Sequence, residues 1–149
     1  MIRMSFPSHA GFNIALASMF LVLASATQAQ PLPASGVELQ GLIDAAPNHG
    51  TVTADRNAPL VLSTPLVIRK PLTLQGLNAE LPPGLGKTPL VAIEADGVSV
   101  TDFELRGNAD SVDQKDRNAL LEIRGSNFRI ERGAFLNSAK DGIMVDGAG

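Results

Sequence analysis

Four charged residues, each placed directly after a short apolar segment, alternate in sign along the chain: Arg69, Glu94, Arg124 and Asp146. If these segments are strands stacked about 4.8 Å apart in one sheet, each charge has an opposite charge above or below it. The column is then either a surface ion-pair ladder, in which each contact contributes about 0–1 kcal/mol, or the charged wall of a groove that binds an acidic polysaccharide as substrate. We favour the ladder, because its negative members would repel a polyuronate.

The polar segment 108–118 (NADSVDQKDRN) is a second candidate site. Asp110, Asp113 and Asp116 could supply oxygen ligands for a hard cation such as Ca²⁺, although Gly and Glu do not stand where an EF-hand loop needs them. Paired carboxylates could also act as acid and base. Long loops lean towards function, but the composition of this one favours the alternative, a solvated polar loop.

A lysine and an aspartate stand together at Lys140 and Asp141. Enzymes that eliminate from or epimerise a uronate need a cation to neutralise the substrate carboxylate and a base to remove a proton. Lys140 or Arg117 could fill the first role and Asp141 the second. Asp141-Gly142 is also an ordinary turn dipeptide, and we favour that interpretation.

Other chemistries lack the residues they require. The segment GLGKT at 84–88 resembles a phosphate-binding loop, but that motif needs glycine at position 81, where Leu81 stands. His49 has no candidate partner for a metal site or a catalytic triad. The chain has no Cys, Tyr or Trp and a formal net charge of −3. We therefore expect no disulfide, no thiolate metal site and no nucleic-acid-binding patch.

The elements that must position these residues repeat along the chain. A set of five apolar positions recurs about thirty residues later, with glycine replacing one of them: Ile93, Val98, Val100, Phe103 and Leu105 become Ile123, Phe128, Ile130, Gly133 and Phe135. Such a stride is typical of stacked units that share a continuous core. Alternation along the strands places two columns of side chains inside the stack: Leu66, Val91, Leu121 and Ile143, and then Ile68, Ile93, Ile123 and Val145.

Short strands and one helix complete the prediction. Segments 51–53, 60–62, 66–68 and 72–74 alternate with a period of two and are separated by Pro59, Pro65, Pro71 and Gly76. Ser35 and Glu38 form a capping box that predicts a helix over 35–46. Its apolar face would shield the first layer of a solenoid.

Three segments carry a family resemblance: PLVIRKPLTLQG at 65–76, DGVSVTDFELRG at 96–107 and GSNFRIERGAFLNSAKDGIMVDG at 125–147. They resemble the layers of the right-handed parallel β-helix (pectate-lyase-like) superfamily, and the resemblance covers roughly residues 39–149. It implies an all-β right-handed parallel β-helix. The superfamily includes polysaccharide lyases, glycoside hydrolases, uronan epimerases, a periplasmic maturation factor and proteins without catalysis, and its enzymes commonly hold substrate along the first sheet.

Two functions are therefore open. The first is an exported carbohydrate-active protein of lyase, hydrolase or epimerase type that acts on a polysaccharide. The second is a non-catalytic exported scaffold, either a surface-binding protein or a maturation factor. The absence of Tyr and Trp removes the stacking surfaces that sugar sites commonly use. We therefore expect the decisive catalytic layers to lie beyond this chain, which we interpret as the N-terminal part of a longer protein; a short protein that dimerises through its open end is the alternative.

The first 29 residues have the layout of a secretory signal peptide. Arg3 provides a basic start, an apolar run covers 14–23, and Thr27-Gln28-Ala29 fits a cleavage site before Gln30. A cut after Ala26, a buried helix or a retained anchor are alternatives. The apolar run is shorter than the roughly 20 residues of a membrane span. We therefore expect a secreted or periplasmic β-helix domain over 30–149, with no integral membrane segment after cleavage.

Overall fold

Short aliphatic segments separated by proline and glycine form parallel strands in the computed structural model of the chain, which describes residues 32–85, 87–111, 113 and 118–147. A helix, α1 (Gly36–Ala45), precedes the strands, and a 3₁₀ turn, η1 (Ala109–Ser111), follows β8. The strands are β1 (Thr51–Thr53), β2 (Leu60–Val61), β3 (Leu66–Ile68), β4 (Thr73–Gln75), β5 (Asn78–Glu80), β6 (Val91–Ile93), β7 (Ser99–Thr101), β8 (Glu104–Arg106), β9 (Leu121–Ile123), β10 (Arg129–Glu131), β11 (Ala134–Leu136) and β12 (Ile143–Val145).

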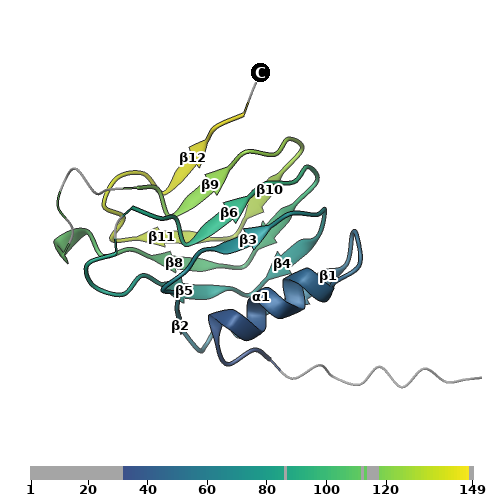
Figure 1. Cartoon of the computed structure of the whole chain (residues 1–149), viewed down its shortest axis with the longest axis horizontal. Helices are drawn as coiled ribbons and strands as arrows, with labels where there is room; N and C mark the ends of the chain where they lie inside the picture. The colour runs from purple at the N-terminus through teal and green to yellow at the C-terminus, as the bar shows by residue number, and fades with distance from the viewer. Residues whose placement is uncertain (1–31, 86, 112, 114–117, 148–149) are drawn as a thin grey trace, which may run out of the picture. The chain divides into compact units, whose positions relative to one another are not determined.

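The strands stack into three parallel sheets, each taking one strand from every layer of the chain. Sheet A has the order β1-β4-β7-β10, sheet B β2-β5-β8-β11 and sheet C β3-β6-β9-β12. Figure 1 shows sheet C as a ladder from β3 to β12, with α1 beyond β3 at the other end of the stack from β12. The predicted fold class, an all-β parallel β-helix with a short helix before the strands, is confirmed.

The predicted register of sheet C is also confirmed. Leu66 pairs with Val91, Val91 with Leu121 and Leu121 with Ile143. The second predicted column pairs in the same way, from Ile68 through Ile93 and Ile123 to Val145. The first three members of each column are at most 2% exposed, so they form the core.

The same columns become exposed in the fourth layer. Ile143 is 38% exposed and Val145 55% exposed, although both continue the inward positions of sheet C. Phe128, on the approach to β10, is 38% exposed. An inward side chain is buried only when a layer covers it on both sides, and within the described residues β12 has a partner on one side alone.

At the corner between sheets A and B, a large side chain, Phe103, packs against a glycine, Gly133. Phe103 precedes β8, and Gly133 occupies the equivalent place one layer later. A Cβ atom at Gly133 would overlap the ring of Phe103, so the glycine makes room for that ring. The ring also meets Phe135 edge-on, with centroids 5.2 Å apart and an interplanar angle of 66°, a favourable arrangement for aromatic pairs.

Helix α1 begins and ends with side-chain caps. The Ser35 hydroxyl accepts a hydrogen bond from the Glu38 amide at 3.2 Å, as the capping box predicts. The Glu38 carboxylate accepts instead from the amide of Ala34, at 2.8 Å, one residue before the expected donor. At the other end, Lys70 donates to the carbonyls of Asp44 and Ala46 at 2.5 and 2.6 Å, where a cation complements the helix dipole.

The helix also satisfies the first edge of sheet C. The side-chain amide of Gln40 donates to the Val67 carbonyl at 3.0 Å and accepts from the Val67 amide at 2.8 Å. It thus reproduces the pair of bonds that a neighbouring strand would make. Leu39 and Ile43 of the same helix are fully buried against the core. Together they close the end of the stack with hydrogen bonds and apolar contact.

The segment predicted to be a signal peptide, residues 1–29, lies outside the described residues, so that prediction and the boundary at Gln30 remain predictions. Among the described residues, no helix has the length and apolarity needed to cross a membrane.

Ile123→Asp should destabilise the domain strongly. The side chain is fully buried in the inward column of sheet C, and an unpaired buried carboxylate costs roughly 3–5 kcal/mol. The matched control is Val145→Asp, which introduces the same group in the same column where the side chain is 55% exposed. Thermal unfolding followed by circular dichroism should show a large fall in Tm for the first variant and a small one for the second. Equal changes would contradict the inward assignment.

Candidate functional site

Three of the four residues in the predicted ladder beside sheet C, Arg69, Glu94 and Arg124, form ion pairs with one another. The guanidinium Nε of Arg69 lies 3.1 Å from Glu94 Oε2, and Arg124 Nη1 lies 4.0 Å from Glu94 Oε1. Stacking places the three residues together, because the amide of Glu94 donates to the Ile68 carbonyl and that of Arg124 to the Ile93 carbonyl. The arginines are 65% and 56% exposed at the side chain. Their ability to bind a substrate stays a prediction.

The fourth member of the column does not extend the ion pairs. The amide of Asp146 donates to the Ile123 carbonyl at 2.8 Å, so its backbone stacks as predicted. Arg124, however, points its second nitrogen back to its own strand, where Nη2 lies 2.6 Å from Glu122 Oε1. Within the described part of the chain, Asp146 makes no ion pair with Arg124.

Glu122 is a candidate that the sequence prediction missed. It is 7% exposed and is the one buried carboxylate among the described residues. It occupies the outward position of β9, between Ala92 and Met144 of the neighbouring strands. A buried carboxylate is costly unless it is paired, and Arg124 provides the pairing. The alternation of Leu121, Glu122 and Ile123 indicated its direction correctly, but direction alone did not reveal that the position is covered.

The predicted cation site is only partly described. Asp110 lies in η1, while Asp116 lies outside the described residues. The Asp110 carboxylate accepts a hydrogen bond from the Asn137 amide at 3.4 Å. Asp113 is exposed and takes part in a polar or electrostatic interaction. Across residues 32–85, 87–111, 113 and 118–147, no group of three His, Cys, Asp or Glu side chains is placed to hold a metal ion, so a Ca²⁺ site using Asp116 stays a prediction.

Two of the predicted catalytic residues, Lys140 and Asp141, lie in the loop before β12. Lys140 and Asp141 are both exposed, and Arg117 lies outside the described residues. The Asp141 carbonyl accepts from the Ser138 hydroxyl at 2.7 Å and from the Leu120 amide at 3.2 Å. These bonds belong to a turn that is tied to the preceding layer, which fits the turn interpretation. A role for Lys140 and Asp141 in proton transfer stays a prediction.

A cleft of about 430 Å³ lies where the strands of sheet B run into their loops. Polar residues make up half of its lining, and apolar side chains and glycine make up the rest: Glu80, Asn108, Asp110, Ser111 and Asn137, with Val61, Leu81, Pro82, Pro83 and Gly107. The predicted site at 108–118 contributes three of these residues, Asn108, Asp110 and Ser111, of which only Asp110 had been assigned a role. Asn137 follows β11 and adopts the left-handed backbone conformation, with a φ of 48°.

Asn108 fixes the wall of this cleft. Its side-chain amide donates to the carbonyls of Pro82 and Leu85, at 2.6 and 2.7 Å, and the residue is 8% exposed. Its side-chain oxygen Oδ1 is buried and accepts no hydrogen bond from any described residue. An unsatisfied buried acceptor costs about 1–3 kcal/mol, which the two bonds made by the amide offset.

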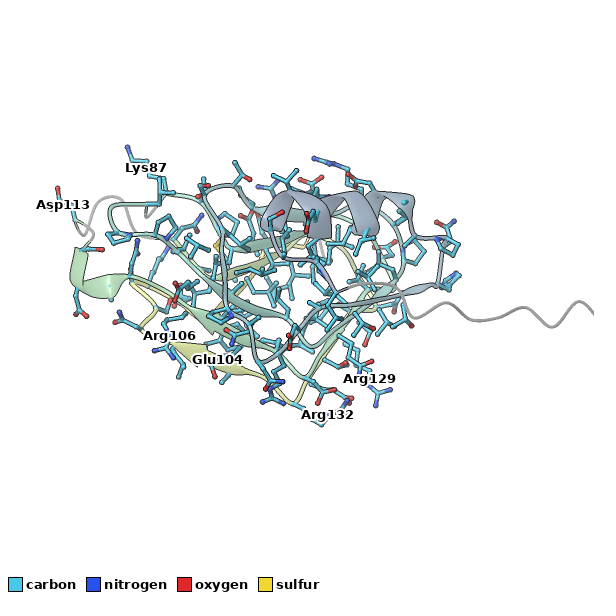
Figure 2. All side chains as sticks on the ribbon, turned by 90° about the horizontal axis from the view of Figure 1, so that it is seen from below. Lys87, Glu104, Arg106, Asp113, Arg129 and Arg132 are labelled. Carbon is cyan, nitrogen blue, oxygen red and sulfur yellow. The ribbon has the colours of Figure 1, made fainter. Side chains whose placement is uncertain are left out.

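Two further ion pairs lie within single strands of sheets A and B. Figure 2 shows Glu104 beside Arg106, and their side chains are 2.9 Å apart. The same view shows Arg129 and Arg132 at the neighbouring corner, where both contact Glu131, at 2.7 and 3.4 Å. The surface of the described layers is thus rich in charge that is already matched locally.

The strongest of these pairs joins two equivalent corners of successive layers. Arg132 donates from Nε and Nη2 to both carboxylate oxygens of Asp102, at 2.7 and 2.8 Å. Both residues adopt the left-handed conformation, with φ of 49° and 55°. The hydrogen bond from Arg132 lowers the pKa of Asp102, and the same bond raises the pKa of Arg132. The pair therefore links the turn after β10 in the fourth layer to the turn after β7 in the third.

No known protein family, curated protein or solved structure matches the chain.

The Asp102–Arg132 pair should make stability depend on pH. The folded pKa of Asp102 lies below its unfolded value of about 3.9, so the unfolded state binds the proton more readily. The stabilisation is therefore present above the unfolded pKa and is lost as the pH falls through the folded pKa. Asp102→Asn, which tolerates the same backbone conformation, should have a lower Tm than the natural chain at pH 7. The difference should shrink below about pH 4; a difference that is constant from pH 7 to pH 3 would contradict the assignment.

Proposed function

We propose that this chain belongs to an exported β-helix protein that binds a polysaccharide, and that binding rather than turnover is the activity of the described layers. The observation that carries this proposal is the repeating polar surface built on stacked parallel strands. Layers that follow one another at about 4.8 Å present equivalent side chains in a line, as Arg69, Glu94 and Arg124 do. A polymer, which also repeats along one direction, suits such a surface.

The pairing of the charged groups supports binding over chemistry. Glu94 is held between two guanidinium groups, and Glu122 and Asp102 are each held by one. A proton-transferring carboxylate needs an oxygen within hydrogen-bond reach of the substrate. Oxygens that are already engaged by arginine suit the recognition of hydroxyl groups around the pair better than the removal of a proton.

The alternative is a carbohydrate-active enzyme of lyase, hydrolase or epimerase type. It would use the exposed side chains of Lys140 and Asp141, with Arg117, for charge neutralisation and proton removal. The support for it is the resemblance to a superfamily that contains such enzymes, and fold alone does not determine activity. The two functions differ in whether a bound polysaccharide is changed.

Binding without turnover is the expected result for this chain. We expect retarded migration in native gels that contain soluble polysaccharides. After prolonged incubation with the same polymers, we expect no new reducing ends and no ultraviolet absorbance from unsaturated uronic acids. The chain unfolded by heat should migrate alike with and without polysaccharide. Product formation that disappears in Asp141→Asn would instead establish the enzymatic alternative.

Export should remove the first 29 residues. The basic start, the apolar run at 14–23 and the small residues before Gln30 form a signal-peptide pattern. Intact-mass analysis of protein recovered from the periplasm or the medium of an expressing bacterium should give a chain that begins at Gln30. Ala29→Asp, which places a charge at the cleavage site, should leave the precursor uncleaved. A full-length chain in the cytosol of cells expressing the natural sequence would contradict export.

A further inference from the structure

The cleft at the loop end of sheet B is lined by residues from four successive layers. Val61 ends β2, the segment 81–83 follows β5, residues 107–111 follow β8, and Asn137 follows β11. Hydrogen bonds between backbones hold these loops in register, because Leu81 donates to the Arg106 carbonyl and Ala109 to the Asn137 carbonyl, at 3.0 and 3.2 Å. The volume of about 430 Å³ falls in the usual range of small-molecule sites, about 300–1,000 Å³.

Side chains fix the shape of the cleft before any ligand arrives. Asn108 clamps the carbonyls of Pro82 and Leu85. The Ser111 hydroxyl donates to the Asn108 carbonyl at 3.0 Å and accepts from the amide of Gly84 at 3.4 Å. A site that is held in this way loses little conformational entropy when it binds, and that preserves affinity.

The lining of the cleft combines apolar and polar groups. Val61 and the rings of Pro82 and Pro83 are apolar, and Glu80 pairs with Val61 on the neighbouring strand. Asp110 adds a second carboxylate, which accepts from the Asn137 side-chain amide at 3.4 Å. Asp110 is exposed, so its remaining lone pairs face solvent. A sugar ring is amphipathic in the same way, with C–H groups on its faces and hydroxyl donors around its rim.

We propose that this cleft binds one uncharged sugar unit of the polysaccharide, an inference that rests on the proposed function. The described lining contains two carboxylates, Glu80 and Asp110, and no Lys or Arg. Like charge would repel a uronate from this place, whereas the hydroxyl groups of an uncharged sugar can donate to the Asp110 carboxylate. Val61, Pro82 and Pro83 then offer apolar contact to a face of the ring. The cleft, and not the charged column beside sheet C, selects the ligand.

Affinity electrophoresis of the intact chain tests this site. The probes are a galactomannan and a β-glucan as uncharged polymers, with polygalacturonate and alginate as acidic ones. Asp110→Ala removes the acceptor and should weaken binding of an uncharged polymer about tenfold, as expected for loss of a hydrogen bond to a charged group. Val61→Trp, at an exposed strand position that tolerates aromatic residues, should fill the cleft and abolish binding. The matched control Asp44→Ala removes an exposed carboxylate on α1, outside the cleft, and should bind like the natural chain.

The outcomes separate this inference from the proposed function. Retention by an uncharged polymer that is lost in the two cleft variants and kept in the control supports the site. Retention by acidic polymers alone, or retention that neither cleft variant changes, overturns the site and leaves polysaccharide binding standing. The absence of retention with every polymer overturns both. Unfolding curves of all the variants confirm that each is folded under the conditions of the gel.

Discussion

The stacking of like apolar side chains from layer to layer is the constraint on which the rest of this structure depends. Each layer contributes only three short strands, which could not bury a core alone. Burial comes from repetition, as in sheet C, where Ile68, Ile93 and Ile123 lie in adjacent strands and are all fully buried. Since a shift of one residue would turn every inward side chain outward, the core fixes the register of all outward groups as well.

The first and fourth described layers have a neighbouring strand on one side only, and they differ in how their inward side chains are covered. At the first layer, Gln40 supplies the hydrogen bonds of a missing strand, and Leu39 and Ile43 supply its apolar contact. At the fourth layer, Ile143 and Val145 occupy equivalent inward positions and remain 38% and 55% exposed. The same physical requirement is therefore satisfied at one end by a single helix and is visible at the other as exposed core residues.

The architecture could be predicted because it follows from two local signals, the period of two within strands and the stride between layers. These signals placed the inward columns correctly, and they predicted the stacking of Arg69, Glu94 and Arg124. They placed β4 one residue too early, at 72–74, whereas its pairing starts at Thr73. Leu72 is apolar and buried like a strand residue, but it lies before the paired segment. The Gln40–Val67 contact joins residues 27 positions apart and has no local signature.

The candidate site was harder to predict, because it is made by the loops, whose lengths the stacking does not constrain. The segments between sheet B and sheet C differ in length from layer to layer, and their meeting depends on contacts such as that of Asn108 with Pro82, 26 residues earlier. Charged residues drew attention to the column beside sheet C, but neutral Asn108, Asn137 and Ser111 shape the cleft.

The division between strands and loops explains where recognition can reside in this fold. At the ends of the strands, register places charges beside those of neighbouring layers, so arginine and carboxylate neutralise one another, as at Glu94 and Asp102. In the loops, the chain can bend towards or away from the stack, and a concave surface becomes possible. Asn108 holds such a bend in place by binding two carbonyls at once. Rigid layers and clamped loops together supply what a binding site needs, a fixed framework and an adjustable shape.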